Sequence, residues 1–373
     1  MRRITYLDSV RGLAAFAVLV YHFIGWRWAE TLEYKLGAML FNGSDAVSLF
    51  FVLSGLVLSW KYFHPDESAP ITGETYRAYI VNRIVRLYVP FLAALSIYYL
   101  YNHRHEPLGL IASDLFTNTH HWVEEALLIR GKHDNYIPAW TLEAEMAGSV
   151  FVPFLVLLLR YSRQLFVALM LGILVLGSAF VFGIIQHFCL GMLLAYFFKK
   201  IEAYDTRQTW WYRYRFGLYA LVLVLFSIRH ITRIFPIGEI GNYWLGLLRL
   251  DLFHITGVAS FLMLAYLINS PRLQHFFTSR VFLFLGRISY SLYLVHWFFV
   301  VYVMEHWDKL AEKLGTNPTQ TFWILLAGTV TATLAGATAF NILIERPAIR
   351  WGRRVSDRFT PVSVSVPHAS LQQ

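Results

Sequence analysis

The stretch SVRGLAAFAVLVYH, residues 9–22, decides the fold class, because it is apolar enough to enter a lipid bilayer. It carries Arg11 near its start and His22 at its end. In a helix these positions differ by about 1100°, about 20° more than three full turns, so both side chains share one face. Asp8, one turn before Arg11, lies close to the same line. The stretch predicts a membrane helix, over residues 9–24, that aligns an acid, a guanidinium and an imidazole.

The composition of the whole chain points the same way. The 373 residues are 57% hydrophobic and 15% charged, whereas about a quarter of a soluble domain is charged. The low share of charged residues is explained by apolar runs of roughly 20 residues, the length that crosses a bilayer as a helix. With a single cysteine, Cys189, the chain has no intrachain disulfide. We therefore predict an all-α integral membrane protein.

Ten transmembrane helices are predicted along the chain. They fall near residues 9–24, 46–60, 87–102, 144–159, 165–182, 184–198, 216–228, 252–268, 288–304 and 322–344. The continuous apolar run 165–198 is divided at Gly183. Of the 32 lysines and arginines, 22 then lie in inner segments, which predicts cytoplasmic termini and explains the net charge of +9 without nucleic acid. Residues 1–350 form the predicted membrane domain, and residues 351–373 a basic and then disordered cytoplasmic tail.

His22 is the first ionisable residue placed inside a predicted span. Arg11 can reach the headgroups on the cytoplasmic side, and His22 then lies about 16 Å farther along the helix axis, past the middle of the membrane. An imidazole at that depth can act as a base between the two compartments. The alternative is a histidine that hydrogen-bonds between helices for packing alone.

The segment PAWTLEAEMAGS places Trp140 at the outer edge of the fourth span, with Glu143 and Glu145 just inside it. Carboxylates at a helix N-terminus favour the helix dipole, which is the structural interpretation. The functional interpretation is that Glu145 faces inward, hydrogen-bonds His22 and sets its tautomer, as acid–histidine pairs do elsewhere.

The segment YIVNRIVRLYVP carries Arg83 and Arg86, one helical turn apart on the predicted cytoplasmic side. Two guanidinium groups bind phosphate well and keep their charge when partly buried. The alternative is that they anchor the chain to anionic lipid.

Three further segments hold polar side chains within or beside predicted spans. GSDAVSLFFVLSG contains Asp45 before the second span, and Ser54 within it beside a glycine that permits close helix packing. GRISYSLYLVH contains Tyr290 and a second intramembrane histidine, His296. In IERPAIRWGRR, we expect Glu345 to end the last span at the cytoplasmic surface.

Two long loops, residues 103–143 and 229–251, lie on the predicted outer side. Their aromatic and polar residues suit a hydroxyl-rich ligand or anchor the loops at the membrane interface. The paired histidines at 103 and 105 and at 120 and 121 lack carboxylate or sulfur partners at metal spacing. We predict no metal site.

Taken in order, these segments resemble the acyltransferase 3 family of membrane O-acyltransferases, over Leu7 to about Arg350. The matching motifs are Arg11 and His22, FFVLSG (50–55), Arg83 and Arg86, WTLEAE (140–145), ISYSLYLVH (288–296) and ERP (345–347). One position departs from the family pattern. Ser48 stands where the family often has Asp, and whether Asp45, one turn earlier, replaces it is left open.

The resemblance implies a donor, an acceptor and a set of roles. The donor is acetyl-CoA or another acyl-CoA from the cytoplasm, bound as substrate near Arg83 and Arg86, with no permanently bound cofactor. The acceptor is a hydroxyl of a polysaccharide or glycolipid at the outer face of a bacterial inner membrane, with glycan-assembly proteins as possible partners. Arg11 marks the donor's entrance. His22, held by Glu145, acts as general base or carries a transient acyl group.

Two other functions fit the same residues. The acceptor of the acyl group can be a small molecule of the macrolide type. Alternatively, the chain is a proton-coupled transporter, because intramembrane His, Glu and Arg are also typical of such carriers.

Overall fold

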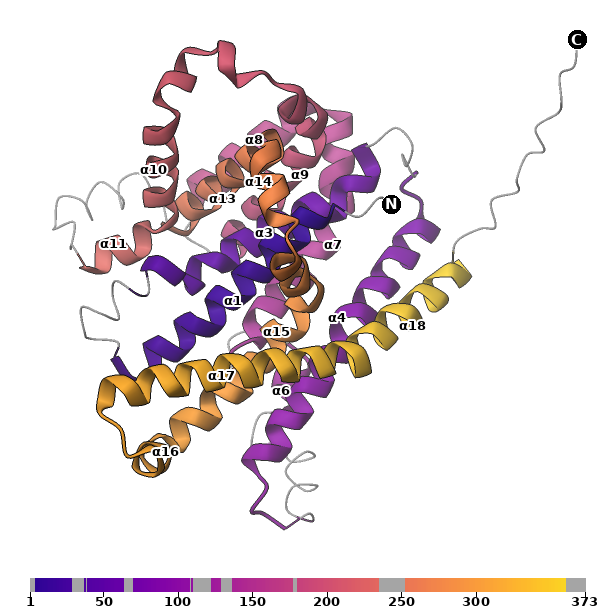
Figure 1. Cartoon of the computed structure of the whole chain (residues 1–373). Coiled ribbons are helices and arrows are strands. Elements are labelled where there is room, and N and C mark those ends of the chain that lie inside the picture. The colour runs from indigo at the N-terminus through magenta and orange to yellow at the C-terminus, as the bar shows by residue number, and fades with distance from the viewer. Residues whose placement is uncertain are drawn as a thin grey trace, which may run out of the picture.

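The computed structural model describes residues 4–28, 37, 39–63, 70–107, 109, 122–128, 136–176, 180–234 and 252–359. Within these ranges the chain forms a bundle of helices that contains no β-strand (Figure 1). Eight of the described helices are long and apolar enough to cross a membrane. The predicted class, an all-α membrane protein, is confirmed.

The eight long helices coincide with eight of the ten predicted spans. They are α1 (Thr5–Trp28), α3 (Gly43–Phe63), α4 (Gly73–Asn102), α7 (Ala139–Tyr161), α9 (Phe180–Ala203), α13 (Leu252–Asn269), α15 (Arg280–Glu305) and α17 (Pro318–Phe340). The other two predicted spans coincide with shorter apolar helices, α8 (Arg163–Leu176) and α10 (Arg215–Phe226), described over 14 and 12 residues. An upright span needs about 20 residues. A count of ten and cytoplasmic termini therefore stay predictions.

Short elements connect or extend these helices. They are α6 (Trp122–Ala126), α11 (Ile228–Ile234), α14 (Pro271–Phe277), α16 (Trp307–Leu314), α18 (Arg346–Ser356), the 3₁₀ turns η2 (Thr206–Gln208), η3 (Trp210–Tyr214) and η5 (Asp357–Phe359), and the π turn η4 (Asn341–Glu345). Of the two predicted outer loops, residues 110–121, 129–135 and 235–251 lie outside the described residues.

Helices α1 and α15 form the most extensive helix pair of the described bundle. A Cβ atom on Gly12 would come within 2.3 Å of the backbone of Leu285, and one on Gly286 within 2.6 Å of the backbone of Asp8. The missing side chains therefore allow the two backbones to touch. Ten residues farther along both helices, the rings of His22 and His296 meet. The two helices therefore run parallel and in register.

Helices α3 and α9 pack closely for the same reason. A Cβ atom on Gly55 would lie 2.3 Å from the carbonyl oxygen of Phe188, and one on Gly191 would lie 2.0 Å from that of Val52. The close approach expected at Ser54 and Gly55 is confirmed. The close contact with α9 fixes the rotation of α3 about its axis, and therefore the direction in which Ser54 points.

The helix of the last span continues beyond the predicted end of that span. Glu345 does not end the helix, because α17, η4 and α18 form one continuous helical stretch, Pro318–Phe359 (Figure 1). Pro347 directly follows the π turn, and its missing N–H leaves one carbonyl group of the preceding turn without a helical donor. The predicted domain boundary at residue 350 falls inside α18, and residues 360–373 lie outside the described residues.

The predicted helix break at Gly183 is also wrong. Helix α9 begins at Phe180, so Gly183 lies inside the helix. A Cβ atom at this position would come within 2.7 Å of the ring of Phe253 on α13. The glycine is required for packing against α13, and it does not mark a turn.

We expect Gly12→Ala to destabilise the protein by about 1–3 kcal/mol, because the added methyl group forces α1 away from α15. Gly328→Ala is the matched control, since it lies inside the apolar helix α17 and a Cβ atom there meets nothing within 4 Å. That substitution should be neutral or slightly stabilising, because alanine favours helix more than glycine. Thermal unfolding of both variants in detergent measures the difference. Equal midpoints would contradict the close contact.

Candidate active site

A cavity of about 410 Å³ lies between α1, α3, α4, α7, α15, η4 and α18. Six arginines and three carboxylates line it: Arg11, Arg83, Arg86, Arg287, Arg346, Arg353, Asp8, Glu145 and Glu345. We call the end of the bundle that holds these arginines the basic end. Cations in such excess over acids suit a ligand that carries several negative charges.

Arg83 and Glu145 form the buried ion pair of this cavity. Arg83, on α4, is 8% exposed, and its guanidinium group contacts the Glu145 carboxylate on α7. Its Nε donates to Ser149 Oγ at 2.9 Å, and Ser54 Oγ on α3 donates to Glu145 Oε1 at 3.0 Å. A buried charge needs such partners. Arg83 is therefore both a structural residue and a member of the cavity wall.

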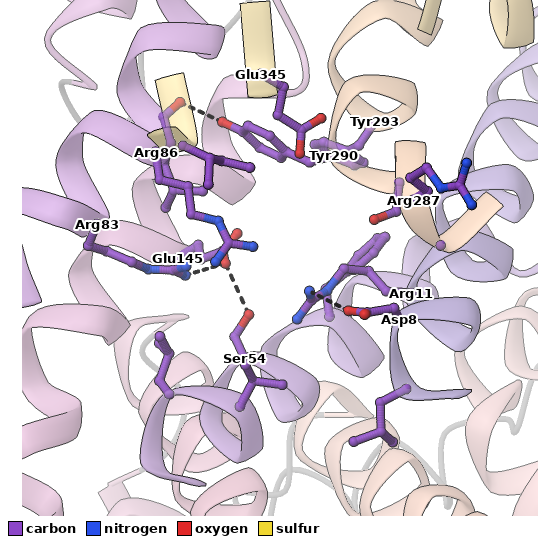
Figure 2. A pocket seen from close by; sticks show the side chains of 18 of the residues that line it. Asp8, Arg11, Ser54, Arg83, Arg86, Glu145, Arg287, Tyr290, Tyr293 and Glu345 are labelled. Carbon is purple, nitrogen blue, oxygen red and sulfur yellow. Dashed lines mark hydrogen bonds and ion pairs between the residues drawn. The ribbon is translucent and has the colours of Figure 1, made fainter. Parts of the chain in front are cut away.

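Other arginines leave their charge available to a ligand. Figure 2 shows Arg86 beside Arg83 and Glu145, and Arg11 with Asp8 on the opposite side of the cavity. Arg11 lies 3.9 Å from Asp8. Within the described chain, Arg86 and Arg287 have no carboxylate within 4.0 Å, and both are exposed. The Arg83–Arg86 patch predicted from the sequence lines the cavity, and Arg287 adds a cation that was not predicted as a site residue.

A second carboxylate of the cavity, Glu345, was predicted only to end a helix. The π turn η4 buries it, and its Oε2 accepts hydrogen bonds from Ser291 Oγ at 2.5 Å and from Asn341 Nδ2 at 2.7 Å. Arg346 Nε donates to Asn341 Oδ1 at 2.9 Å. π turns are common at functional sites. The ERP motif was the sequence signal for this cluster, but it did not reveal the turn.

The two intramembrane histidines meet deeper in the bundle than the arginines, ten residues beyond Gly12 and Gly286 along α1 and α15. His22 Nδ1 lies 3.0 Å from His296 Nε2, and the two rings are nearly parallel, at 6°. The indole of Trp297 packs edge-on against His22, with ring centroids 5.4 Å apart. His296 is fully buried, whereas His22 is half-buried. We call these two residues the histidine pair.

The hydrogen bonds of the histidine pair determine where its protons lie. His296 Nδ1 is 2.5 Å from the carbonyl oxygen of Tyr293, which can only accept, so Nδ1 carries the proton. In a neutral ring, His296 Nε2 is then an acceptor, and His22 Nδ1–H donates to it. Within the described chain no carboxylate pairs with either ring, which favours neutral rings in this apolar setting. His22 Nε2 therefore keeps a free lone pair.

The predicted hydrogen bond between His22 and Glu145 is wrong. Glu145 bonds to Arg83 and Ser54, and His22 bonds to His296. The residues that line the cavity do not include either histidine and reach only as far as Tyr293 and Leu294. The candidate side chains thus form two levels, a cavity with arginines and, beyond it, the histidine pair.

The remaining predicted site residues occupy different places. Tyr290 lines the cavity and donates to the Leu87 carbonyl at 2.6 Å. Trp140 packs edge-on against Phe51 at 6.5 Å, and neither Trp140 nor the half-buried Glu143 is among the described residues that line the cavity. The predicted set therefore divides into cavity residues, the histidine pair and residues outside both.

Asp45 lies in a separate buried cluster. Its carboxylate is 3.0 Å from Arg229 Nη1 and 3.5 Å from His230 Nδ1, both on α11. Ser48, at the family's usual Asp position, shares a hydrogen bond of 2.9 Å with Thr256 on α13. Asp45 thus connects α3 to α11 and does not reach the cavity described above.

Comparison with known proteins identifies the family to which the chain belongs. The chain is 25% identical over 357 residues to the O-acetyltransferase PaAT-1 of Phomopsis amygdali, an alignment that covers 78% of this chain and 71% of the relative. No solved structure matches the chain. The family model described as an acyltransferase domain matches residues 4–341, nearly the whole described bundle. The chain therefore belongs to the acyltransferase 3 family of membrane proteins.

Proposed function

We propose that this membrane acyltransferase moves an acyl group, in the first place acetyl, from acyl-CoA to a hydroxyl of a polysaccharide or glycolipid. The observation that carries the proposal is the two-level site, a cavity with six arginines and, beyond it, a neutral histidine with a free lone pair. The name of the relative from Phomopsis amygdali, an O-acetyltransferase, supports acetyl as the group.

The charge and the length of acyl-CoA support it as the donor. Coenzyme A carries several phosphate groups at one end and its thioester at the end of a long flexible arm. Arg86 and Arg287, which have no carboxylate partner in the described chain, are placed to bind phosphate oxygens. Gly286, at the basic end of the cavity, and His296, in the histidine pair, are ten residues or about 15 Å apart along α15. The arm of the donor is suited to span that distance.

The reaction needs one base and one proton path. His22 Nε2 takes the proton of the acceptor hydroxyl as its oxygen attacks the thioester carbon. The carbon–sulfur bond breaks, the ester forms, and the thiolate of coenzyme A takes up the proton. His296 holds the Nδ1–H of His22 in place and thereby directs the Nε2 lone pair at the acceptor. In this mechanism, His22 is the catalytic residue and His296 a positioning residue.

The side from which each substrate arrives follows from where the substrates are made. Acyl-CoA is a cytoplasmic metabolite, so we infer that the basic end of the bundle faces the cytoplasm, in agreement with the positive-inside bias. The acceptor then reaches the histidine pair from the opposite face. A bacterial inner membrane and glycan-assembly partners remain predictions that cell fractionation and co-purification test.

We expect Arg86→Gln to weaken acetyl-CoA binding by about tenfold or more, the usual effect of losing one charge-assisted hydrogen bond. Substitution of Arg86 tests donor binding more directly than substitution of Arg83, because Arg83 also pairs with Glu145 and its loss affects folding. Arg358→Gln, on the exposed turn η5 outside the cavity, is the charge-matched control. Calorimetric titration of the purified protein measures both affinities. An affinity of Arg86→Gln equal to wild type would remove this arginine from the donor site.

We expect His22→Ala to lower the rate of acyl transfer by about 10²–10⁴-fold, the usual contribution of a general base. His296→Leu should lower kcat by about 10–100-fold with KM for acetyl-CoA unchanged, since it removes only the group that orients His22. His296→Gln keeps an oxygen that accepts from His22 and should recover part of kcat. Steady-state ester formation measures all three variants.

Two outcomes would change the roles of the histidines. Ester formation at the wild-type rate in His22→Ala would remove the base from the mechanism. An acyl group found on His22 after rapid quenching would make this residue the nucleophile and not the general base.

A further inference from the structure

The inner end of the cavity differs in character from its basic end. Phe50 on α3, Leu142 on α7 and Leu294 on α15 line it, together with the hydroxyl group of Thr141 and the ring of Tyr293. All these residues lie beyond the arginines, toward the histidine pair. An apolar recess of this kind suits the acyl group of a thioester, and the arginines suit the charged part of the same donor.

Tyr293 lies between the cavity and the histidine pair. Its hydroxyl is 2.6 Å from Thr141 Oγ1 and its ring meets that of Phe50 edge-on, with centroids 5.7 Å apart. The same ring lies 5.5 Å from that of His296, centroid to centroid. Among the described residues, Tyr293 lines the cavity, whereas His22 and His296 do not. The tyrosine ring therefore forms the wall that the two parts of the site share.

The backbone and the side chain of Tyr293 serve different purposes. Its carbonyl oxygen accepts the hydrogen bond from His296 Nδ1, and this contact survives any substitution of the side chain. The side chain is held in place by the hydrogen bond to Thr141 and the packing against Phe50. A substitution at this position can therefore remove the wall and leave the orientation of His296 intact.

We propose that the side chain of Tyr293 closes the acyl subsite and selects short acyl chains, an inference that rests on the proposed acyl-CoA donor. A longer chain on the thioester collides with the ring while the phosphates are still held by the arginines. An acetyl group fits in front of the ring. For transfer, the ring turns aside as the thioester carbon comes within reach of the acceptor hydroxyl beside His22, and this movement breaks the hydrogen bond to Thr141 and the packing against Phe50.

We expect Tyr293→Ala to shift donor selectivity toward longer acyl chains. The experiment compares kcat/KM for acetyl-, butyryl- and hexanoyl-CoA in the full chain, purified in lipid nanodiscs. The wild type should prefer acetyl-CoA, and Tyr293→Ala should raise the hexanoyl-to-acetyl ratio by tenfold or more, since apolar pockets discriminate by about 10–200-fold per methylene group. Tyr293→Phe keeps the ring and should keep the wild-type ratio.

Tyr290→Ala is the matched control. Tyr290 is one turn earlier on α15 and lines the same cavity, but its hydroxyl bonds to the Leu87 carbonyl at the level of the arginines. Removing that ring enlarges the cavity without opening its inner end. The chain-length ratio of Tyr290→Ala should therefore equal that of wild type.

An unchanged ratio in Tyr293→Ala, or an equal change in Tyr290→Ala, would overturn the proposal. If Tyr293→Ala is too unstable to assay, Tyr293→Leu and the binding of unreactive ethyl- and hexyl-CoA thioethers decide the same question without catalysis. If Tyr293→Leu binds the hexyl thioether no better, relative to the ethyl thioether, than the wild type does, the proposal is overturned. A wild-type protein that transfers no acyl group from any donor would refute the proposed function instead, and the thioether affinities would still test the wall.

Discussion

The contact between α1 and α15 at Gly12 and Gly286 determines the geometry of the site. Two parallel helices whose backbones touch at one level cannot slide past each other, so residues ten positions farther on meet in a fixed register. That register brings His22 to His296, although the two residues lie 274 positions apart in the chain. It also places Gly286 and Arg11 together in the wall of the cavity.

The charges around the cavity follow from the cost of burying them. Arg83 is buried and is therefore held by Glu145 and Ser149, while Arg86 stays exposed at the cavity and has no carboxylate partner in the described chain. The same rule applies to Glu345, whose carboxylate accepts two hydrogen bonds from neutral donors. The unpaired cations are the groups that an anionic ligand would neutralise, which links the charge pattern to the proposed donor.

The histidine pair achieves with a carbonyl group what many enzymes achieve with a carboxylate. The carbonyl of Tyr293 fixes the tautomer of His296, and His296 in turn fixes that of His22. No ion needs to be buried beside the base, which suits a site inside an apolar bundle. The side chain of the same tyrosine lines the cavity, and its ring contacts that of His296, so one residue touches the pair through its backbone and the cavity through its ring.

The sequence by itself determined the long helices and the family of the protein. Apolar runs of membrane length located the long helices, and the spacing of Arg11 and His22 placed both on one face of α1, because these properties depend on neighbours along the chain. The family resemblance likewise rested on local motifs. It also identified Arg83, Arg86 and Glu145, all three of which line the cavity.

Only the tertiary structure decided which of these side chains meet. Glu145 was expected to hold His22 but pairs with Arg83, and the partner of His22 is His296. The contacts of Glu345 and Tyr293 were not predicted either, since the first depend on a π turn and the second on side chains from three helices. Such contacts are set by packing between helices far apart in sequence, and residue spacing within one helix carries no information about them.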